Sequence, residues 1–389
     1  PIAAIFSWIF DKTPDGFIKT EKTTPIKPVI KNTNPFYLQK RNIILMIGVL
    51  SGIILGRFGQ NILPKNQELN SKSIAVLPFE NLSKDGEDEY FADGMTEDIL
   101  TELSKIKDLL VISRTTIMKY KGTKKTIKEI GKELGVANIL EGSIRLSGNR
   151  VRITGQLINA LNDQHLWAEK YDRDIEDIFS VQDEVANAIA NALRIELSDE
   201  EARMISTTQT ESIEAYDYYI KGRTSSYFYE VQKNIEAVEY YKKAIEIDPQ
   251  YSLPYAGISR VRMSQFTIQY MDQDFSVFDL KEAEEFAKKA VMLGPNEAET
   301  NFALGFFYNA TQQFDLAFNS FNKAIMLNPS HAHAHDEIGD VYLYSYGDFD
   351  SAIRWYDKAL QRDRELVPAK WFKAEILLRS GQVKKVLEG

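Results

Sequence analysis

The sequence predicts a multidomain protein: a transmembrane helix, then a small mixed α/β domain, then an α-α superhelix. Three observations predict this fold class. An apolar run without a polar face lies before residue 64, strand and helix periods alternate over 72–197, and small and aromatic residues recur beyond 213. With 389 residues, the chain is long enough for two or more domains.

The most specific pattern of the superhelix lies in residues 298–331. Small residues allow two antiparallel helices to approach closely, aromatic residues fill the space beside them, and a proline ends the second helix. Seven positions carry this spacing: Leu304, Gly305, Tyr308, Ala317, Phe321, Ala324 and Pro329. The pattern is identified as a tetratricopeptide repeat, a helix pair that binds other molecules.

Further repeats surround this unit, because a single repeat cannot bury its faces alone. We expect four repeats over 213–389 and a truncated fifth that opens at Pro368. The unit after residue 331 has one extra residue in its turn at 345–347, and residues 264–279 resemble an insertion. The segment EAYDYYIKGR at 214–223 is similar to the usual entry into such repeats.

The first helix of each repeat is expected to line a concave groove. In the two best-matched repeats this places the following side chains toward the groove: Phe302, Phe306, Asn309, His333, Asp336, Asp340 and Tyr344. The first interpretation is a surface that binds a protein or peptide partner. The alternative, given equal weight, is that these residues are ordinary packing and surface residues. A homo-oligomer is also compatible with the sequence.

The amino-terminal region predicts membrane association. Residues 1–10 resemble the end of a truncated hydrophobic helix, and residues 11–41 form a polar, lysine-rich linker. Residues 42–63 contain the run IILMIGVLSGIILG and predict a transmembrane helix, which Arg57 lengthens if its charged end reaches the interface. A buried core helix is the alternative, but the run has no polar face.

The positions of lysine and arginine orient this helix. Residues 11–41 hold seven of them and residues 57–72 hold three. Because basic loops stay on the cytoplasmic side, 11–41 is expected to be a cytoplasmic linker. Residues after about 64 are then expected in the periplasm of a bacterium, with the helix in its inner membrane.

Residues 72–197 predict the α/β domain, with elements in the order β-α-β-α-β-β-α. Strands are expected at 73–79 and 109–113, and a hairpin at 138–160. A capping box of Thr126 with Glu129 begins a helix over 126–135. Ser180 with Asp183 is expected to cap the final helix.

Two segments of this domain resemble the TolB-like (FlgO-type) domain of bacteria, which commonly precedes tetratricopeptide repeats. They are SIAVLPFENLSKDGEDEYFADGMTEDILTELSKI and GVANILEGSIRLSGNRVRITGQLINALNDQHLWAEKYDRDIEDIFSVQDEVANAIA. The amino-terminal SWIFDKTPDGFIKT also resembles the end of a hydrophobic hairpin in a subset of that family. Other members place the region behind a winged-helix activator, a nucleotide cyclase or a protein kinase. The resemblance implies a sensing or interaction role and names no ligand.

Composition and motifs give little support to a catalytic, nucleotide-binding or metal-binding function. The chain has no cysteine, which excludes disulfides and thiol nucleophiles, and its net charge of −9 argues against a nucleic-acid partner. No phosphate-binding loop and no nucleophile-base pair is found. The histidines of HAHAH at 331–335 favour a helix start over a metal site, and the acidic run at 85–93 favours a solvated loop over a cation site.

The sequence therefore predicts no catalytic residue, cofactor or metal, and a protein that is not an enzyme. Its expected function is membrane-anchored recognition or sensing, with residues 42–63 in the membrane and a partner in the repeat groove. The alternative is the sensory half of a signalling protein whose output domain, a cyclase, kinase or winged-helix regulator, is missing from this chain.

Overall fold

The computed structural model describes residues 10–13, 16–19, 70–83, 88–207, 209–227, 230–269, 280–380 and 382. The predicted transmembrane helix at 42–63 lies outside the described residues, as do 1–9 and 20–41. Among the described helices, none combines the length and apolar character that a membrane span needs. β1 (Phe10–Thr13) pairs antiparallel with β2 (Gly16–Lys19), within the stretch predicted as a helix end and a linker.

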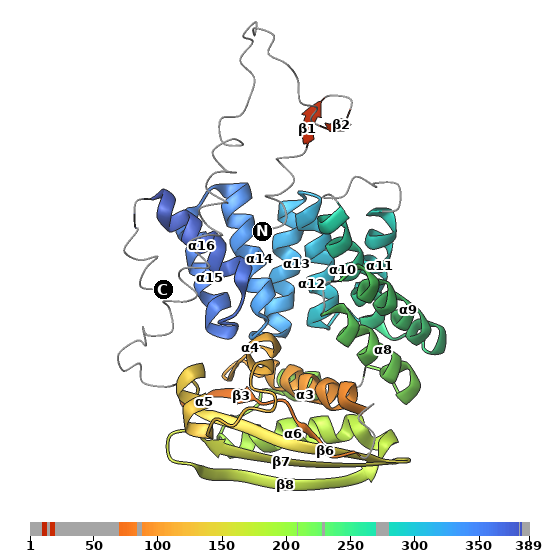
Figure 1. Ribbon diagram of the computed structural model, residues 1–389, viewed down its shortest axis with the longest axis vertical. Helices are drawn as coiled ribbons and strands as arrows, with labels where there is room; N and C mark the ends of the chain where they lie inside the picture. Colours follow the sequence, from red (N-terminus) through yellow and green to blue (C-terminus); the bar gives the residue numbers. More distant parts are fainter. Residues whose placement is uncertain are drawn as a thin grey trace, which may run out of the picture.

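A mixed α/β domain occupies residues of about 70–190, and a helical array of tetratricopeptide repeats follows it. In Figure 1 the α/β domain forms the lower layer and the helices of the repeats stand above it. The sheet has the order β5-β3-β6-β7-β8, with β4 beside β6. Its strands are β3 (Ser73–Val76), β4 (Glu80–Asn81), β5 (Leu110–Val111), β6 (Asn138–Ser147), β7 (Arg150–Asn159) and β8 (Gln164–Asp174).

Helices cover both faces of this sheet. The helices of the domain are α3 (Glu89–Ser104), α4 (Arg114–Met118), α5 (Ile127–Leu134) and α6 (Ile178–Ala192). Ile74 and Val76 of β3 pack with α3 and α6 in the larger core, whereas Ala75 packs with α4 and α5 in a smaller one. Because β3 is buried on both sides, it appears in the sequence as a continuous apolar run.

Several predicted elements of this domain are confirmed. α5 has the capping box of Thr126 and Glu129 and ends at Gly135, whose φ of 65° is easily adopted by glycine. β6 and β7 form the expected hairpin, with Ser147 opposite Arg150. β3 lies between β5 and β6 and is parallel to both. β7 pairs antiparallel with β6, and β8 pairs antiparallel with β7.

Two expectations for the domain are wrong. β8 pairs with β7 over its length but was not expected as a strand, because one of its faces is exposed and its charged residues hide the alternation. The final helix does not begin at a cap formed by Ser180 and Asp183. A short 3-10 turn (Ile175–Asp177) leads into α6, which starts at Ile178 because that side chain is buried in the core.

The repeats are antiparallel helix pairs joined by short turns. Their helices are α8 (Ile213–Ser226), α9 (Val231–Ile247), α10 (Ser252–Gln269), α11 (Leu280–Leu293), α12 (Ala298–Ala310), α13 (Phe314–Leu327), α14 (Ala332–Val341), α15 (Phe349–Arg362) and α16 (Val367–Arg379). α7 (Asp199–Ile205) connects the two parts of the chain. The extra residue predicted at 345–347 is accommodated by a π-helical turn, η5 (Tyr342–Tyr346), which ends at Gly347 with a φ of 62°.

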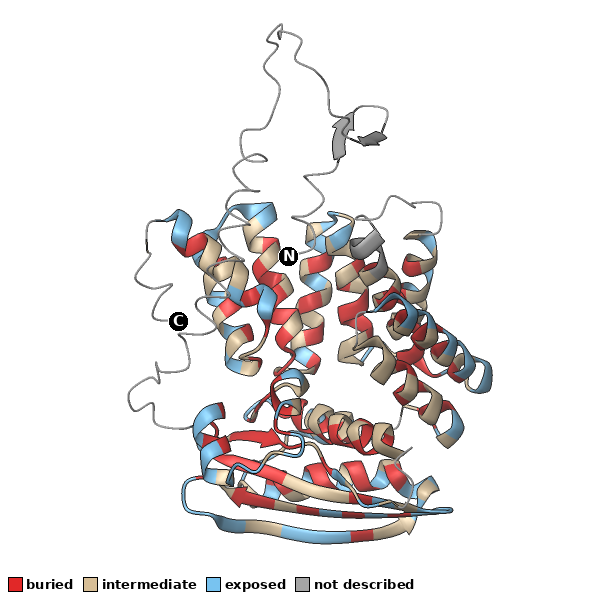
Figure 2. Cartoon of the chain, viewed as in Figure 1, coloured by how far each residue is buried: buried red, intermediate tan, exposed pale blue. Residues whose placement is uncertain are grey.

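The close helix approach inferred from the repeat pattern is present. A Cβ atom at Gly305 would lie 2.7 Å from Cδ1 of Phe321, and one at Gly339 would lie 2.5 Å from Cε1 of Tyr356. Ala317, Phe321 and Ala324 have no exposed surface, whereas Leu304, Tyr308 and Pro329 are partly buried. Figure 2 shows the buried residues running along the facing sides of these helices.

Candidate functional site

The concave face of the first repeat is already occupied by the α/β domain. Gly222 in α8 corresponds to Gly305 in α12, because each packs on the aromatic residue of its partner helix. This register gives Tyr219 and Arg223 the positions that Phe302 and Phe306 hold in α12. Arg223 faces α3, so at this end an element of the same chain covers the side that the sequence predicts to face the groove.

Arg223 is the centre of this contact. Its Nη1 lies 2.8 Å from Oδ1 of Asp98, its Nε lies 3.2 Å from Oε2 of Glu97, and its Nη2 donates to the carbonyl of Gly94 at 3.0 Å. Burial disfavours the charge of Arg223, but the two carboxylates more than offset it and hold its pKa well above the ordinary value. Arg223, Glu97 and Asp98 therefore form a buried ion network in which the charges compensate one another.

Two tyrosines and a second arginine complete the contact. Tyr216 donates to Asp98, and Tyr227 donates to Glu97. Arg114 of α4 lies with Nε 3.1 Å from Oε2 of Glu97 and with its guanidinium carbon 3.9 Å from the centre of the Tyr227 ring. Arg114 is thus bound by the carboxylate of Glu97 and the aromatic ring of Tyr227 together.

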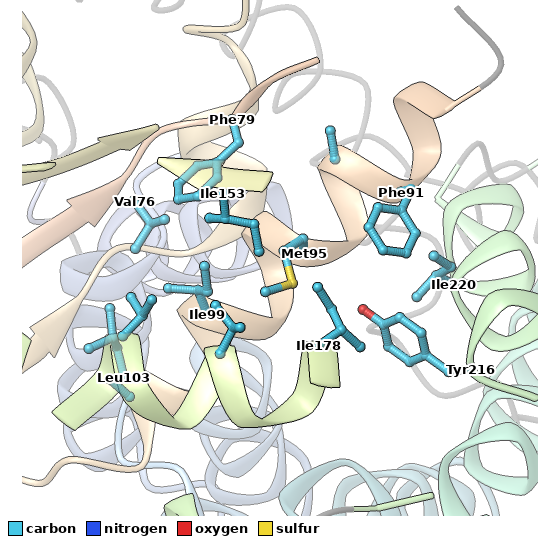
Figure 3. Close-up of a cluster of buried hydrophobic side chains, with 14 of the residues drawn as sticks. Val76, Phe79, Phe91, Met95, Ile99, Leu103, Ile153, Ile178, Tyr216 and Ile220 are labelled. Atoms are coloured by element: carbon cyan, nitrogen blue, oxygen red, sulfur yellow. The ribbon is translucent and has the colours of Figure 1, made fainter. Parts of the chain in front are cut away.

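The apolar core is continuous across this contact. Figure 3 shows Met95 and Phe91 of α3 beside Tyr216 of α8 and Ile178 of α6. One cluster of buried residues extends from β3 through α3 into α8, α9 and α10. Gly94 allows the close approach, because a Cβ atom there would lie 3.2 Å from Cγ2 of Ile220. The two parts therefore share one core.

A second contact seals the edge of the sheet. β5 is an edge strand, and its inner amides pair with β3: Ile112 donates to the carbonyl of Ile74 at 3.0 Å. The outer amides pair with turns between repeats. Val111 donates to Oγ of Ser330 at 3.2 Å, and Ser113 donates to the carbonyl of Arg362 at 2.8 Å. An edge that would otherwise invite strand addition is thereby protected.

The other predicted groove residues lie on α12, on α14 and on the turn that follows α14. Phe302, predicted as a groove residue, is only 4% exposed and packs against Phe306, Phe321 and His331. It belongs to the packing between repeats more than to a contact surface. His333 lies beside the same ring, with 6.3 Å between the ring centres.

A charged network adjoins Phe302. Arg260 of α10 pairs with Glu299 at 2.8 Å, and Nε2 of His331 lies 3.1 Å from the other oxygen of Glu299. Burial would raise the pKa of Glu299, but Arg260 and His331 outweigh it and lower that pKa. Burial, and then Arg260, lower the pKa of His333 to about 4, so His333 is neutral at pH 7.

The side chains of α14 bring acids together. α14 also carries Glu337, next to Asp336 in the sequence, which was not predicted as a groove residue. Asn309 of α12 donates to Oε2 of Glu337 at 2.7 Å, and Tyr356 of α15 donates to Oδ1 of Asp340 at 2.6 Å. Asn309 therefore contacts an acid of the next repeat.

Tyr344 is the most exposed of the predicted groove residues, with 55% of its surface accessible. It lies on the π-helical turn, and its ring meets that of Phe372 in α16 edge to face at 5.9 Å. Among the described residues, no group of three His, Cys, Asp or Glu side chains is arranged to hold a metal. His331 instead caps α14, since its Nδ1 accepts from the amide of Ala334 at 3.1 Å.

Comparisons with known proteins agree with the two parts of the fold. Residues 70–189 match the family described as the second domain of HilA/YgeH-like transcriptional regulators. Residues 226–251 and 298–331 match the tetratricopeptide repeat. A putative adenylate cyclase 3 of Rhizobium meliloti (strain 1021) is 39% identical over 246 residues, which is 63% of this chain and 41% of the relative.

Other likenesses are weaker. Anaphase-promoting complex subunit 6 of Arabidopsis thaliana is 26% identical over 37% of this chain and 24% of its own length. A tetratricopeptide-repeat protein of Thermus thermophilus is 22% identical, with a TM-score of 0.35, over 51% of this chain and 92% of that one. MamA is 23% identical, with a TM-score of 0.31, over 43% of this chain and 88% of its own. The chain thus spans less than half the length of either curated relative.

Proposed function

We propose that this chain is the recognition part of a signalling protein. The repeats bind a protein partner in the groove, and the α/β domain transmits the bound state to an output domain outside this sequence. The regulator-type match of residues 70–189 and the 39% identity with a putative adenylate cyclase support a signalling role over a free-standing adaptor. A nucleotide cyclase is accordingly the first candidate for the output.

The shared core is the observation that carries this proposal. α3 packs on the sheet and α6 with one face and on α8 with another, so it belongs to both parts at once. Packed interiors transmit displacement because they have few voids to absorb it. A partner that shifts the repeats would therefore shift α3 and the sheet behind it.

Three finer expectations belong to this proposal. The α/β domain is of the TolB-like (FlgO-type) class, the chain itself performs no catalysis, and residues 42–63 anchor it in the bacterial inner membrane. Residues after about 64 would then lie in the periplasm. Reporter fusions after Leu63 and after Gly389 test the location: two exported reporters agree with it, and two cytoplasmic reporters contradict it.

The groove can be tested by site-specific photocrosslinking in cells. A crosslinking amino acid at Tyr344, which is exposed beside the groove, is expected to capture a discrete protein. The matched control is Met326 on the outer helix α13, which is 61% exposed. Equal capture at both positions would count against the groove. Phe302→Ala is unsuitable for this test, because the ring is part of the core.

A further inference from the structure

The acidic groove cluster, defined as Asp336, Glu337 and Asp340, contains a carboxyl group that the fold leaves unsatisfied. Asp336 is 4% exposed, and no described residue donates a hydrogen bond to its Oδ1. Burial first, and then the charge of Asp340, hold the pKa of Asp336 well above its ordinary value. The carboxyl group therefore lies near the other two acids, and an unpaired buried acceptor of this kind is costly.

Among the described residues, the other two acids have only neutral donors. Asn309 donates to Glu337, and Tyr356 donates to Asp340. Burial and mutual repulsion raise the pKa of Glu337 to about 8, and burial raises that of Asp340 to about 7. The three acids of the cluster lie close together on α14 and thus disfavour one another's ionisation.

Cations on two other helices of the repeats pair with acids outside the cluster. Arg260 of α10 pairs with Glu299 at 2.8 Å, and Lys373 of α16 pairs with Asp357 at 2.6 Å. Across the part of the chain that the structure describes, no ion pair joins a lysine or arginine to a member of the cluster. Asp363 places a further buried carboxyl group near Asp336: it is 1% exposed, its Oδ1 accepts from Thr116 and from the amide of Glu365, and its Oδ2 has no described donor.

The first repeat shows how such a charge is satisfied in this protein. There the positions equivalent to Asp336 and Asp340 are Tyr219 and Arg223, and Arg223 binds carboxylates presented by α3. At α14 the sign is reversed: the groove presents the acids, so the complementary ligand must present the cation. The exposed ring of Tyr344 nearby resembles the ring of Tyr227, which stacks on Arg114 beside Glu97.

We propose that the acidic groove cluster binds a cationic side chain, arginine or lysine, of an extended segment of the protein partner. The partly exposed Glu337 and Asp340 contact the cation, and Asp336 supplies charge beneath them. This inference rests on the proposed function, because it needs a partner in the groove. Binding at pH 7 would release protons, since a cation lowers the raised pKa values of these carboxyl groups.

The test begins with a phage-displayed library of random ten-residue peptides, selected on the whole 389-residue chain. We expect arginine or lysine to be enriched among the selected peptides. The best peptide is then titrated against the variant D336N/E337Q/D340N, where we expect an affinity loss of about tenfold or more. Removing repulsion among the three acids should leave this variant at least as stable as the parent.

A matched control separates local from overall charge. The variant E239Q/E246Q/D350N replaces the same number of carboxyl groups at exposed positions outside the cluster, and its affinity should change by no more than about twofold. Titration in buffers of different ionisation enthalpy should show proton release for the parent chain and none for the cluster variant.

The results distinguish this inference from the proposed function. If selected peptides crosslink at position 344 but lack basic residues, or if both variants weaken binding equally, the acidic cluster is not the cation site and the groove still stands. If no peptide binds and no partner crosslinks at position 344, the groove and this inference both fail.

Discussion

The two ends of the repeat groove use the same helix positions in opposite ways. In α8, Arg223 faces α3 and pairs with Glu97 and Asp98 in a largely buried contact. In α14, Asp336 and Asp340 occupy the same positions and have neutral donors or none. The repeat therefore specifies where these side chains lie, whereas their identity decides which charge they present.

The largest effect is expected from removing the arginine that joins the two parts. Arg223→Met leaves Glu97 and Asp98 buried beside an apolar chain, and breaking a buried pair costs about 3–5 kcal/mol. Urea unfolding measures the loss. The control Arg203→Met changes an exposed arginine whose Nε contacts only a backbone carbonyl of its own helix, at Asp199. A loss below about 1 kcal/mol for Arg223→Met would mean that the shared core and the β5 contact, and not this ion pair, join the two parts.

An intermediate effect is expected at the two equivalent glycines. A Cβ atom would lie 2.8 Å from Cδ1 of Tyr241 at Gly222 and 2.5 Å from Cε1 of Tyr356 at Gly339. Overpacking costs about 1–3 kcal/mol, so Gly222→Ala and Gly339→Ala should destabilise the chain similarly in thermal or urea unfolding. Similar losses would show that packing is the same at both ends although the groove residues differ. If only one variant loses stability, the repeats are not equivalent.

The smallest effect concerns the pH dependence of Asp340. Its folded pKa of about 7 lies above the ordinary value near 4, so its contribution to stability is present at low pH and is lost as pH rises toward 7. Asp340→Asn should therefore increase the free energy of unfolding at pH 8 relative to the parent, and change it little at pH 4. The half-buried position limits the size of this effect. A variant less stable than the parent at pH 8 would contradict it.

Much of the fold could be predicted from the sequence because local patterns carry it. The capping box of Thr126, the glycine at 135 and the small-aromatic spacing of 298–331 each depend on residues a few positions apart. β8 was missed for the converse reason. It is a strand because β7 lies beside it, and its own exposed, charged residues do not reveal that neighbour.

The candidate site could be predicted only in part. The helical period placed Phe302 and Asp336 on the groove side, but it could not show that both are buried. Glu337 was missed because its hydrogen bond reaches Asn309 of another repeat. A signal for the α8 contact was present, since alignment of Gly222 with Gly305 gives Tyr219 and Arg223 groove positions. The partners Glu97 and Asp98 lie more than a hundred residues away, and no pattern in the sequence identifies them as partners of Arg223.

Periodicity and composition were sufficient for the order of the α/β domain and the repeats, for the helix pairs of the repeats and for the absence of cysteine chemistry. These features are local or summed properties of the chain, so they can be derived without coordinates. Three others needed the folded chain: α3 covers the groove side of α8, repeat turns seal β5, and the acids of α14 stand unpaired by any described cation. Each depends on the free energy of contacts between distant segments, and burial in three dimensions sets that free energy.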